Sequence, residues 1–178
     1  MQEIGKKHGV PQMVALSQDC FKKSRLSKPR DIADDIVRVV SRASMVSRFE
    51  KSKSRDFVNA LLEAEIKLLA LGLKNFLHGK QQKGFDELVD TLLRRKLVKW
   101  PLVPIIPNYF RPDDEVFVKP TTAKGVIEQF EPECLQYHPR PKREFYEEYR
   151  KQIPDMRSRV HYSLSQQRRL LQIPHDES

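Results

Sequence analysis

An acidic group followed by a lysine is the arrangement in this chain that most resembles part of a hydrolytic site. It comprises Asp113, Asp114, Glu115 and Lys119. Carboxylates of this kind hold Mg²⁺ beside a scissile phosphate in metal-dependent nucleases, but the acids and the lysine must converge on one point. Residues 115–119 alternate as a short strand does, and along a strand Glu115 and Lys119 would lie about 13 Å apart. A metal-dependent nuclease using these residues is therefore an alternative that their spacing disfavours.

The rest of the sequence contains no complete set of residues for a metal site or for a catalytic nucleophile. Cys134 and His138 have the spacing of half a zinc site, but no second pair stands at a matching distance. Neither cysteine lies in a recognisable nucleophile setting, and Cys20 and Cys134 do not indicate a disulfide framework. We therefore expect no metal, no cofactor and reduced thiols, and the balance of these observations favours a non-enzymatic protein.

Basic residues form the second group whose chemistry points to a function. Lysine and arginine number 33 against 24 acidic residues, which gives a formal charge of +9 and favours a polyanionic partner. They are dispersed over several segments, and some lie beside aromatic residues, an arrangement that holds nucleic acid by charge and stacking together. The candidate nucleic-acid-binding residues are Arg38, Arg42, Arg48, Lys80, Lys83, Lys119, Thr121, Lys124, Arg140, Lys142 and Arg143.

Each basic segment also has a purely structural interpretation. Arg38 and Arg42 lie one turn apart on a predicted helix, where two aspartates, about one turn before Arg38 and two turns before Arg42, would pair with them as readily as a phosphate would. Thr121 is predicted to cap a helix whose free amides, with the flanking lysines, would form an anion pocket. An ordinary capped helix with two surface lysines explains the same residues.

Helices are needed to position these side chains, and the central apolar pattern predicts them. Apolar residues recur at intervals of three and four over residues 31–50, 54–77 and 85–96. The first and third runs also begin with acids and end with bases, as the helix dipole favours. Residues 78–84 are predicted to be a polar loop. Three helices joined by short loops should pack as antiparallel neighbours.

Composition divides the chain into three parts. Residues 1–30 are predicted to be a basic N-terminal arm that is partly disordered, with few apolar anchors. Residues 31–153 are predicted to form a helical domain, long enough to bury a hydrophobic core. Residues 154–178 are predicted to be a C-terminal extension or tail.

The second half of the predicted domain is broken by prolines. The segment from Trp100 to Phe110 is apolar but contains three prolines, so we expect short turns that cover the core. Further helices are predicted over residues 122–131 and 144–152. The predicted fold class is mainly α: a compact bundle of three or more helices with a short strand and an extended, proline-broken C-terminal part.

The leading hypothesis is a non-enzymatic nucleic-acid-binding protein, for DNA or RNA, that uses dispersed basic patches and mainly backbone contacts. The alternative from another class is a protein–protein adaptor or assembly subunit whose partner binds the segment from Trp100 to Phe110. No apolar stretch is long enough to cross a membrane, and the cysteine usage indicates a cytoplasmic or other intracellular protein. A basic, serine-containing N-terminus is also compatible with organelle targeting.

Overall fold

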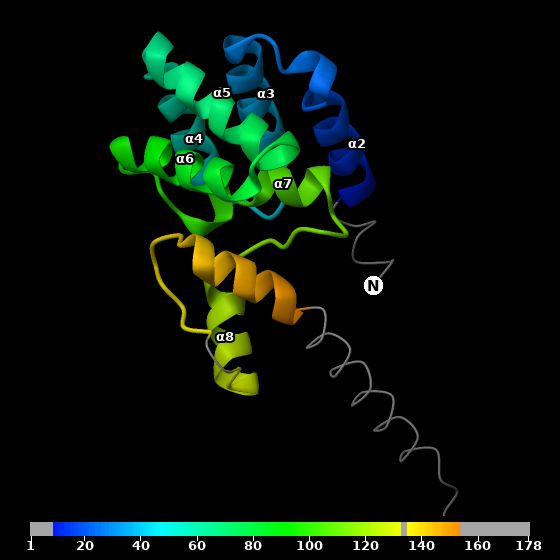
Figure 1. The fold of residues 1–178 in the computed structure, drawn as a ribbon, viewed down its shortest axis with the longest axis vertical. Helices are drawn as coiled ribbons and strands as arrows, with labels where there is room; N and C mark the ends of the chain where they lie inside the picture. Colours follow the sequence, from blue (N-terminus) through cyan, green and yellow to red (C-terminus); the bar gives the residue numbers. More distant parts are fainter. Residues whose placement is uncertain (1–8, 133–134, 154–178) are drawn as a thin grey trace, which may run out of the picture.

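Helices account for all regular secondary structure in residues 9–132 and 135–153, the part of the chain described by this computed structural model. A mainly α fold is therefore confirmed. Figure 1 shows α2 to α7 as one body, with α8 and a further helix beneath it. The helices are α2 (Val10–Cys20), α3 (Pro29–Arg42), α4 (Arg48–Asn59), α5 (Glu63–His78), α6 (Gln81–Arg94), α7 (Ile105–Phe110), α8 (Pro120–Phe130) and one over residues 143–153, with 3₁₀ turns at Lys23–Arg25 and Trp100–Leu102.

The first predicted helix is two helices, α3 and α4, because a capping box starts a new helix at Arg48. The Ser47 hydroxyl accepts a hydrogen bond from the Glu50 N–H at 3.2 Å, and the Glu50 carboxylate accepts one from the Ser47 N–H at 3.1 Å. These bonds satisfy amides that have no partner within the first turn of a helix. The single helix predicted over residues 31–50 is therefore wrong, because α3 ends at Arg42 and α4 begins at Arg48.

The second predicted helix is divided too, and the third begins earlier than its apolar pattern indicates. α5 begins after Leu62, whose N–H donates a hydrogen bond to the Glu65 carboxylate at 2.9 Å. Only Gly79 and Lys80 separate α5 from α6, so much of the predicted loop is helical. Gly84 permits this close packing, because a Cβ there would lie 2.6 Å from the Cα of Phe76 on α5. The two helices therefore meet backbone against backbone.

The proline-broken segment closes the core. Trp100 and Ile105 are fully buried, and Tyr109 is 1% exposed. The Trp100 indole also donates a hydrogen bond to the carbonyl of His138 at 2.6 Å, which ties the segment to the C-terminal part of the chain. The expected cover over the core is confirmed. Most of the segment is buried within this chain, which leaves little surface for a partner, and the predicted protein contact there stays a prediction.

No strand forms over residues 115–119, and the predicted strand is wrong. Glu115 instead points into the protein, where its side chain is 1% exposed. Four side chains donate hydrogen bonds to its two carboxylate oxygens: Gln81 at 2.6 Å, Arg111 at 2.7 Å, Tyr146 at 2.7 Å and Arg150 at 3.3 Å. These bonds connect α6 and the segment after α7 to the helix over residues 143–153. The buried Glu115 carboxylate thus ties the body formed by α2 to α7 to the helix over residues 143–153 beneath it (Figure 1).

The N-terminal segment is more ordered than its composition indicates. α2 packs against α7 and α3, and Ser17 donates a hydrogen bond to the carbonyl of Ile106 at 3.5 Å. Gln18 donates another to the carbonyl of Phe110 at 3.2 Å. Within residues 9–30, α2 packs on the core through an apolar face. The predicted partial disorder of the arm stays a prediction, because residues 1–8 lie outside the described residues.

Some predictions concern residues that the structure does not describe, namely 1–8, 133–134 and 154–178. The structure therefore tests neither the role of Cys134 nor the predicted tail. Within the described part, no helix combines the length and the apolar character that a membrane crossing requires.

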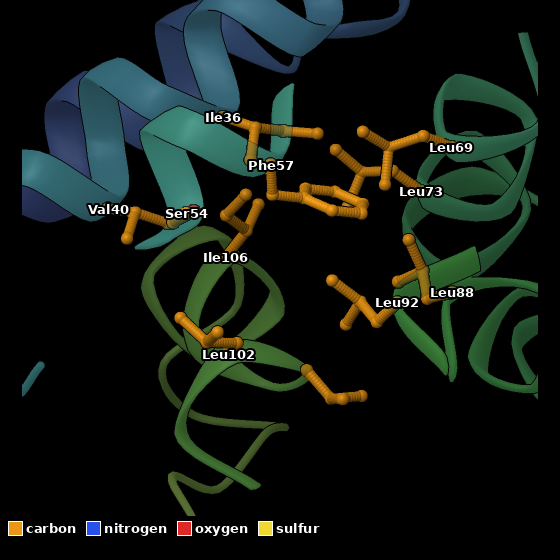
Figure 2. Close-up of a pocket in the computed structure, with 11 residues that line it drawn as sticks. Ile36, Val40, Ser54, Phe57, Leu69, Leu73, Leu88, Leu92, Leu102 and Ile106 are labelled. Atoms are coloured by element: carbon orange, nitrogen blue, oxygen red, sulfur yellow. The ribbon is translucent and has the colours of Figure 1, made fainter. Parts of the chain in front are cut away.

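A small apolar cavity lies where α3, α4, α5 and α6 meet the segment before α7. Figure 2 shows Phe57 from α4, Leu73 from α5 and Leu88 from α6 around it. Its volume is about 30 Å³, close to the share of one molecule in liquid water. A cavity of this size cannot hold an organic ligand, so it is a packing feature of the core.

Candidate nucleic-acid interface

The predicted arginines of the first helical region do not form one row. Arg38 lies on α3, with its guanidinium 3.8 Å from the carboxylate of Asp35. Asp35 also faces Arg25 at 3.5 Å, so its charge is shared between two arginines. Arg42 ends α3 and Arg48 begins α4; both are exposed, and neither forms an ion pair with any described residue. The helix break therefore separates Arg48 from the other two.

Lys80 and Lys83 lie at the start of α6 instead of in a loop. Lys80 is the N-cap residue and is exposed. The Lys83 ammonium lies 3.6 Å from the carboxylate of Glu87, one turn further along α6. An exposed pair of this kind contributes little to stability, but it leaves Lys83 less available to a phosphate than Lys80.

Lys119, Thr121 and Lys124 gather at the start of α8, but the predicted cap is absent. Lys119 is the N-cap residue, and no side chain forms a cap hydrogen bond there. Thr121 is exposed in the first turn. The Lys124 ammonium instead lies 5.2 Å from the centre of the Tyr137 ring. The anion pocket that required a Thr121 cap is therefore wrong, although both lysines remain on the surface.

In the basic segment over residues 140–143, two side chains are exposed to solvent and one packs against α6. Arg140 and Lys142 are exposed. Arg143 begins the helix over residues 143–153, and its Nε lies 3.4 Å from the carboxylate of Asp86 on α6. Burial raises the pKa of Asp86, and the charge of Arg143 opposes that shift. Arg143 therefore helps to attach this helix to α6.

The acidic group and its lysine do not converge on one point. Asp113, Asp114 and Lys119 are exposed, whereas both oxygens of Glu115 already accept hydrogen bonds inside the protein. Burial, with Glu115 as the next cause, raises the pKa of the Tyr146 phenol well above its usual value, so the phenol stays protonated and donates a hydrogen bond to the Glu115 carboxylate. Among the residues that the structure describes, no three His, Cys, Asp or Glu side chains are grouped to hold a metal ion.

An exposed aromatic ring flanked by lysines is a feature that the apolar spacing of the sequence does not reveal. Phe49, in the first turn of α4, is 61% exposed. The Lys53 ammonium lies 4.2 Å from the centre of its ring, and the Lys99 ammonium lies 5.9 Å from it. We define the α4 patch as Arg48, Phe49, Lys53, Arg55 and Lys99, which are all exposed. Within residues 9–132 and 135–153, none of its four cations forms an ion pair.

The position of the patch follows from the amphipathic pattern of α4. Ser54, Phe57 and Val58 are buried, which turns the opposite side of the helix to solvent. Arg48 and Arg55 are seven residues apart, so they lie on the same side and about two turns from each other. Lys99 comes from the segment after α6 and brings a second element of the chain to the same surface.

A local signal in the sequence reveals this exposure. Apolar spacing alone assigns Phe49 to the buried stripe of a long helix. Ser47 followed three residues later by Glu50 is the signature of a helix start, however. When a new helix begins at Arg48, the register of that stripe is lost, and Phe49 falls on the polar face.

Comparison with known proteins gives no relative: the chain has no significant match to a protein-family model, to a curated protein or to a solved structure.

Proposed function

We propose that this protein binds nucleic acid without catalysing a reaction, and that the α4 patch is its main contact surface. The observation that carries the proposal is the exposed ring of Phe49 with two ammonium groups, those of Lys53 and Lys99, within 5.9 Å of its centre. The cations of the patch have no carboxylate partner among the described residues, whereas Arg38, Lys83 and Arg143 each face one. The other dispersed basic residues are secondary contacts to the sugar–phosphate backbone in this proposal.

Unpaired cations matter because they are free to exchange counterions for phosphates. α4 carries the cations Arg48, Lys51, Lys53 and Arg55 against two acids. One of these acids, Glu50, is held in the capping box and does not pair with a cation. Each phosphate that such a cation neutralises releases a counterion, which makes binding favourable and lowers the affinity as salt rises.

A protein–protein adaptor is the second candidate function, and exposed leucines favour it. Leu68 and Leu71 lie three residues apart on α5 and are 39% and 45% exposed, while Leu62 before α5 is 68% exposed. Exposed apolar side chains that lie close together, as Leu68 and Leu71 do on α5, are typical of protein contacts. This surface differs from the buried segment around Trp100, and a protein that fails to bind any oligonucleotide near physiological salt would fit the adaptor better.

Fluorescence anisotropy with labelled oligonucleotides tests the proposal. The double variant Arg48→Glu/Arg55→Glu removes two cations of the patch, and we expect it to bind at least about tenfold more weakly than the wild type at the same salt. The matched control is Lys67→Glu/Lys74→Glu, which changes the net charge equally through two exposed lysines of α5. Equal weakening in both double variants would mean that net charge alone, and not the α4 patch, drives binding.

A further inference from the structure

We infer that the α4 patch prefers single-stranded nucleic acid to duplex, with one base stacked on the ring of Phe49. This inference rests on the proposed function and deepens it by naming the substrate class. DNA and RNA single strands share the chemistry that the patch recognises, a base with an open face beside a phosphate.

The ring of Phe49 is an accessible platform on the first turn of a capped helix. It lies in the first turn of α4, which the capping box between Ser47 and Glu50 holds in place. At 61% exposure it is the most exposed aromatic side chain among the described large hydrophobic residues. Other rings, such as those of Trp100 and Tyr146, are enclosed in the core. Stacking on a base would remove this apolar surface from water.

The two lysines at the ring favour a ligand that is both aromatic and anionic. Lys53 lies over the ring at 4.2 Å, and Lys99 lies at 5.9 Å. A stacked base is worth more than a cation–π contact at an exposed site, so a base can displace the Lys53 ammonium from the ring. The displaced ammonium stays on the patch, where the phosphates on either side of the base are within its reach. An uncharged aromatic ligand would lose this second interaction.

The two arginines of the α4 patch extend its cationic surface along α4. Arg48 precedes Phe49 directly, and Arg55 lies on the same side of α4 as Arg48, about two turns further on. A flexible single strand can place one base on the ring and still bring neighbouring phosphates to both guanidiniums. A duplex keeps its bases stacked on each other inside the helix, so it can offer only its phosphates to the same surface.

Three substitutions at position 49 separate stacking from charge. Anisotropy is measured for the full chain with unstructured 20-mers of DNA and of RNA and with a DNA duplex of the same length. Phe49→Ala is expected to lower single-strand affinity about tenfold, equivalent to about 1.4 kcal/mol, and to leave duplex affinity unchanged. Phe49→Tyr keeps the ring and should restore single-strand binding. Leu71→Ala, which removes exposed apolar surface on α5, is the matched control and should change neither affinity.

Phe49→Trp gives a direct spectroscopic readout. The other indole of the chain, Trp100, is fully buried, so the added indole is the one that responds to a ligand on the surface. Single strands should quench its fluorescence and duplex should not. Unchanged single-strand affinity in Phe49→Ala, with binding still lost in Arg48→Glu/Arg55→Glu, would overturn the stacking inference and leave the proposed function standing. A wild-type protein that binds neither form would overturn both.

Discussion

Replacing Gly84 by alanine is expected to weaken the α5–α6 contact more than it strengthens α6. An alanine Cβ would lie 2.6 Å from the Cα of Phe76 and 2.7 Å from the carbonyl carbon of Asn75, whereas ordinary contact begins near 3.4 Å. The obstructing atoms belong to the backbone, so no side chain can swing aside and the helices must separate by about 1 Å. Overpacking of this kind costs about 3 kcal/mol at the upper end of its usual range, while alanine gains about 1 kcal/mol in helix propensity. The expected net loss is therefore about 2 kcal/mol.

The assay is urea unfolding, followed by far-UV circular dichroism and by the fluorescence of Trp100, with the free energy of unfolding taken from linear extrapolation. Gly125→Ala is the matched control, because Gly125 is also helical but a Cβ there meets no atom within 4 Å. That variant should be unchanged or more stable by up to about 1 kcal/mol. A Gly84→Ala variant that is as stable as Gly125→Ala would refute the close approach of α5 and α6.

The remaining predictions concern two buried groups. Glu115→Ala removes the acceptor shared by Arg111 and Arg150 and should lower the free energy of unfolding by about 3 kcal/mol. Glu115→Gln keeps an acceptor oxygen and should lower it by less. Wild-type stability in Glu115→Ala would contradict this role of Glu115. Burial raises the pKa of the Cys20 thiol from 9.0 to about 11. In a Cys134→Ser background, a disulfide reagent at pH 8 should therefore label Cys20 only after unfolding. Rapid labelling of the folded protein would be inconsistent with the burial of Cys20. Because the folded pKa lies above the unfolded value, this thiol contributes stability below pH 9 that is lost as the pH rises towards 11, which urea unfolding at pH 8 and pH 10.5 measures.

Periodic apolar residues were sufficient to predict the helical core, but not where its helices end. Ile36, Leu73 and Leu88 lie in the predicted stripes, and all are buried. The ends depend on single hydrogen bonds, such as those of Ser47 with Glu50, which an average over a window of residues does not register. The same bonds determine that Phe49 is exposed, so an error in a helix boundary became an error in the candidate site.

Long-range partners were beyond prediction from one sequence. Glu115 was predicted to begin a short strand, and nothing near it in sequence indicates Gln81 or Tyr146 as its partners. Its burial depends on how the helix over residues 143–153 docks onto α6. The segment around Trp100 was predicted to cover the core, but nothing near Trp100 in sequence indicates the carbonyl of His138 as the acceptor of its indole hydrogen bond. That pairing depends on how the C-terminal part of the chain packs, which only the folded arrangement defines.

The salt dependence of single-strand binding tests the central claim most directly. The slope of log affinity against log salt should be steep and negative for the wild type, and shallower in Arg48→Glu/Arg55→Glu by roughly 0.7 for each lost phosphate contact. The Lys67→Glu/Lys74→Glu control should keep the wild-type slope. Identical slopes for the wild type and the Arg48→Glu/Arg55→Glu variant would show that α4 does not meet phosphates and would contradict the account.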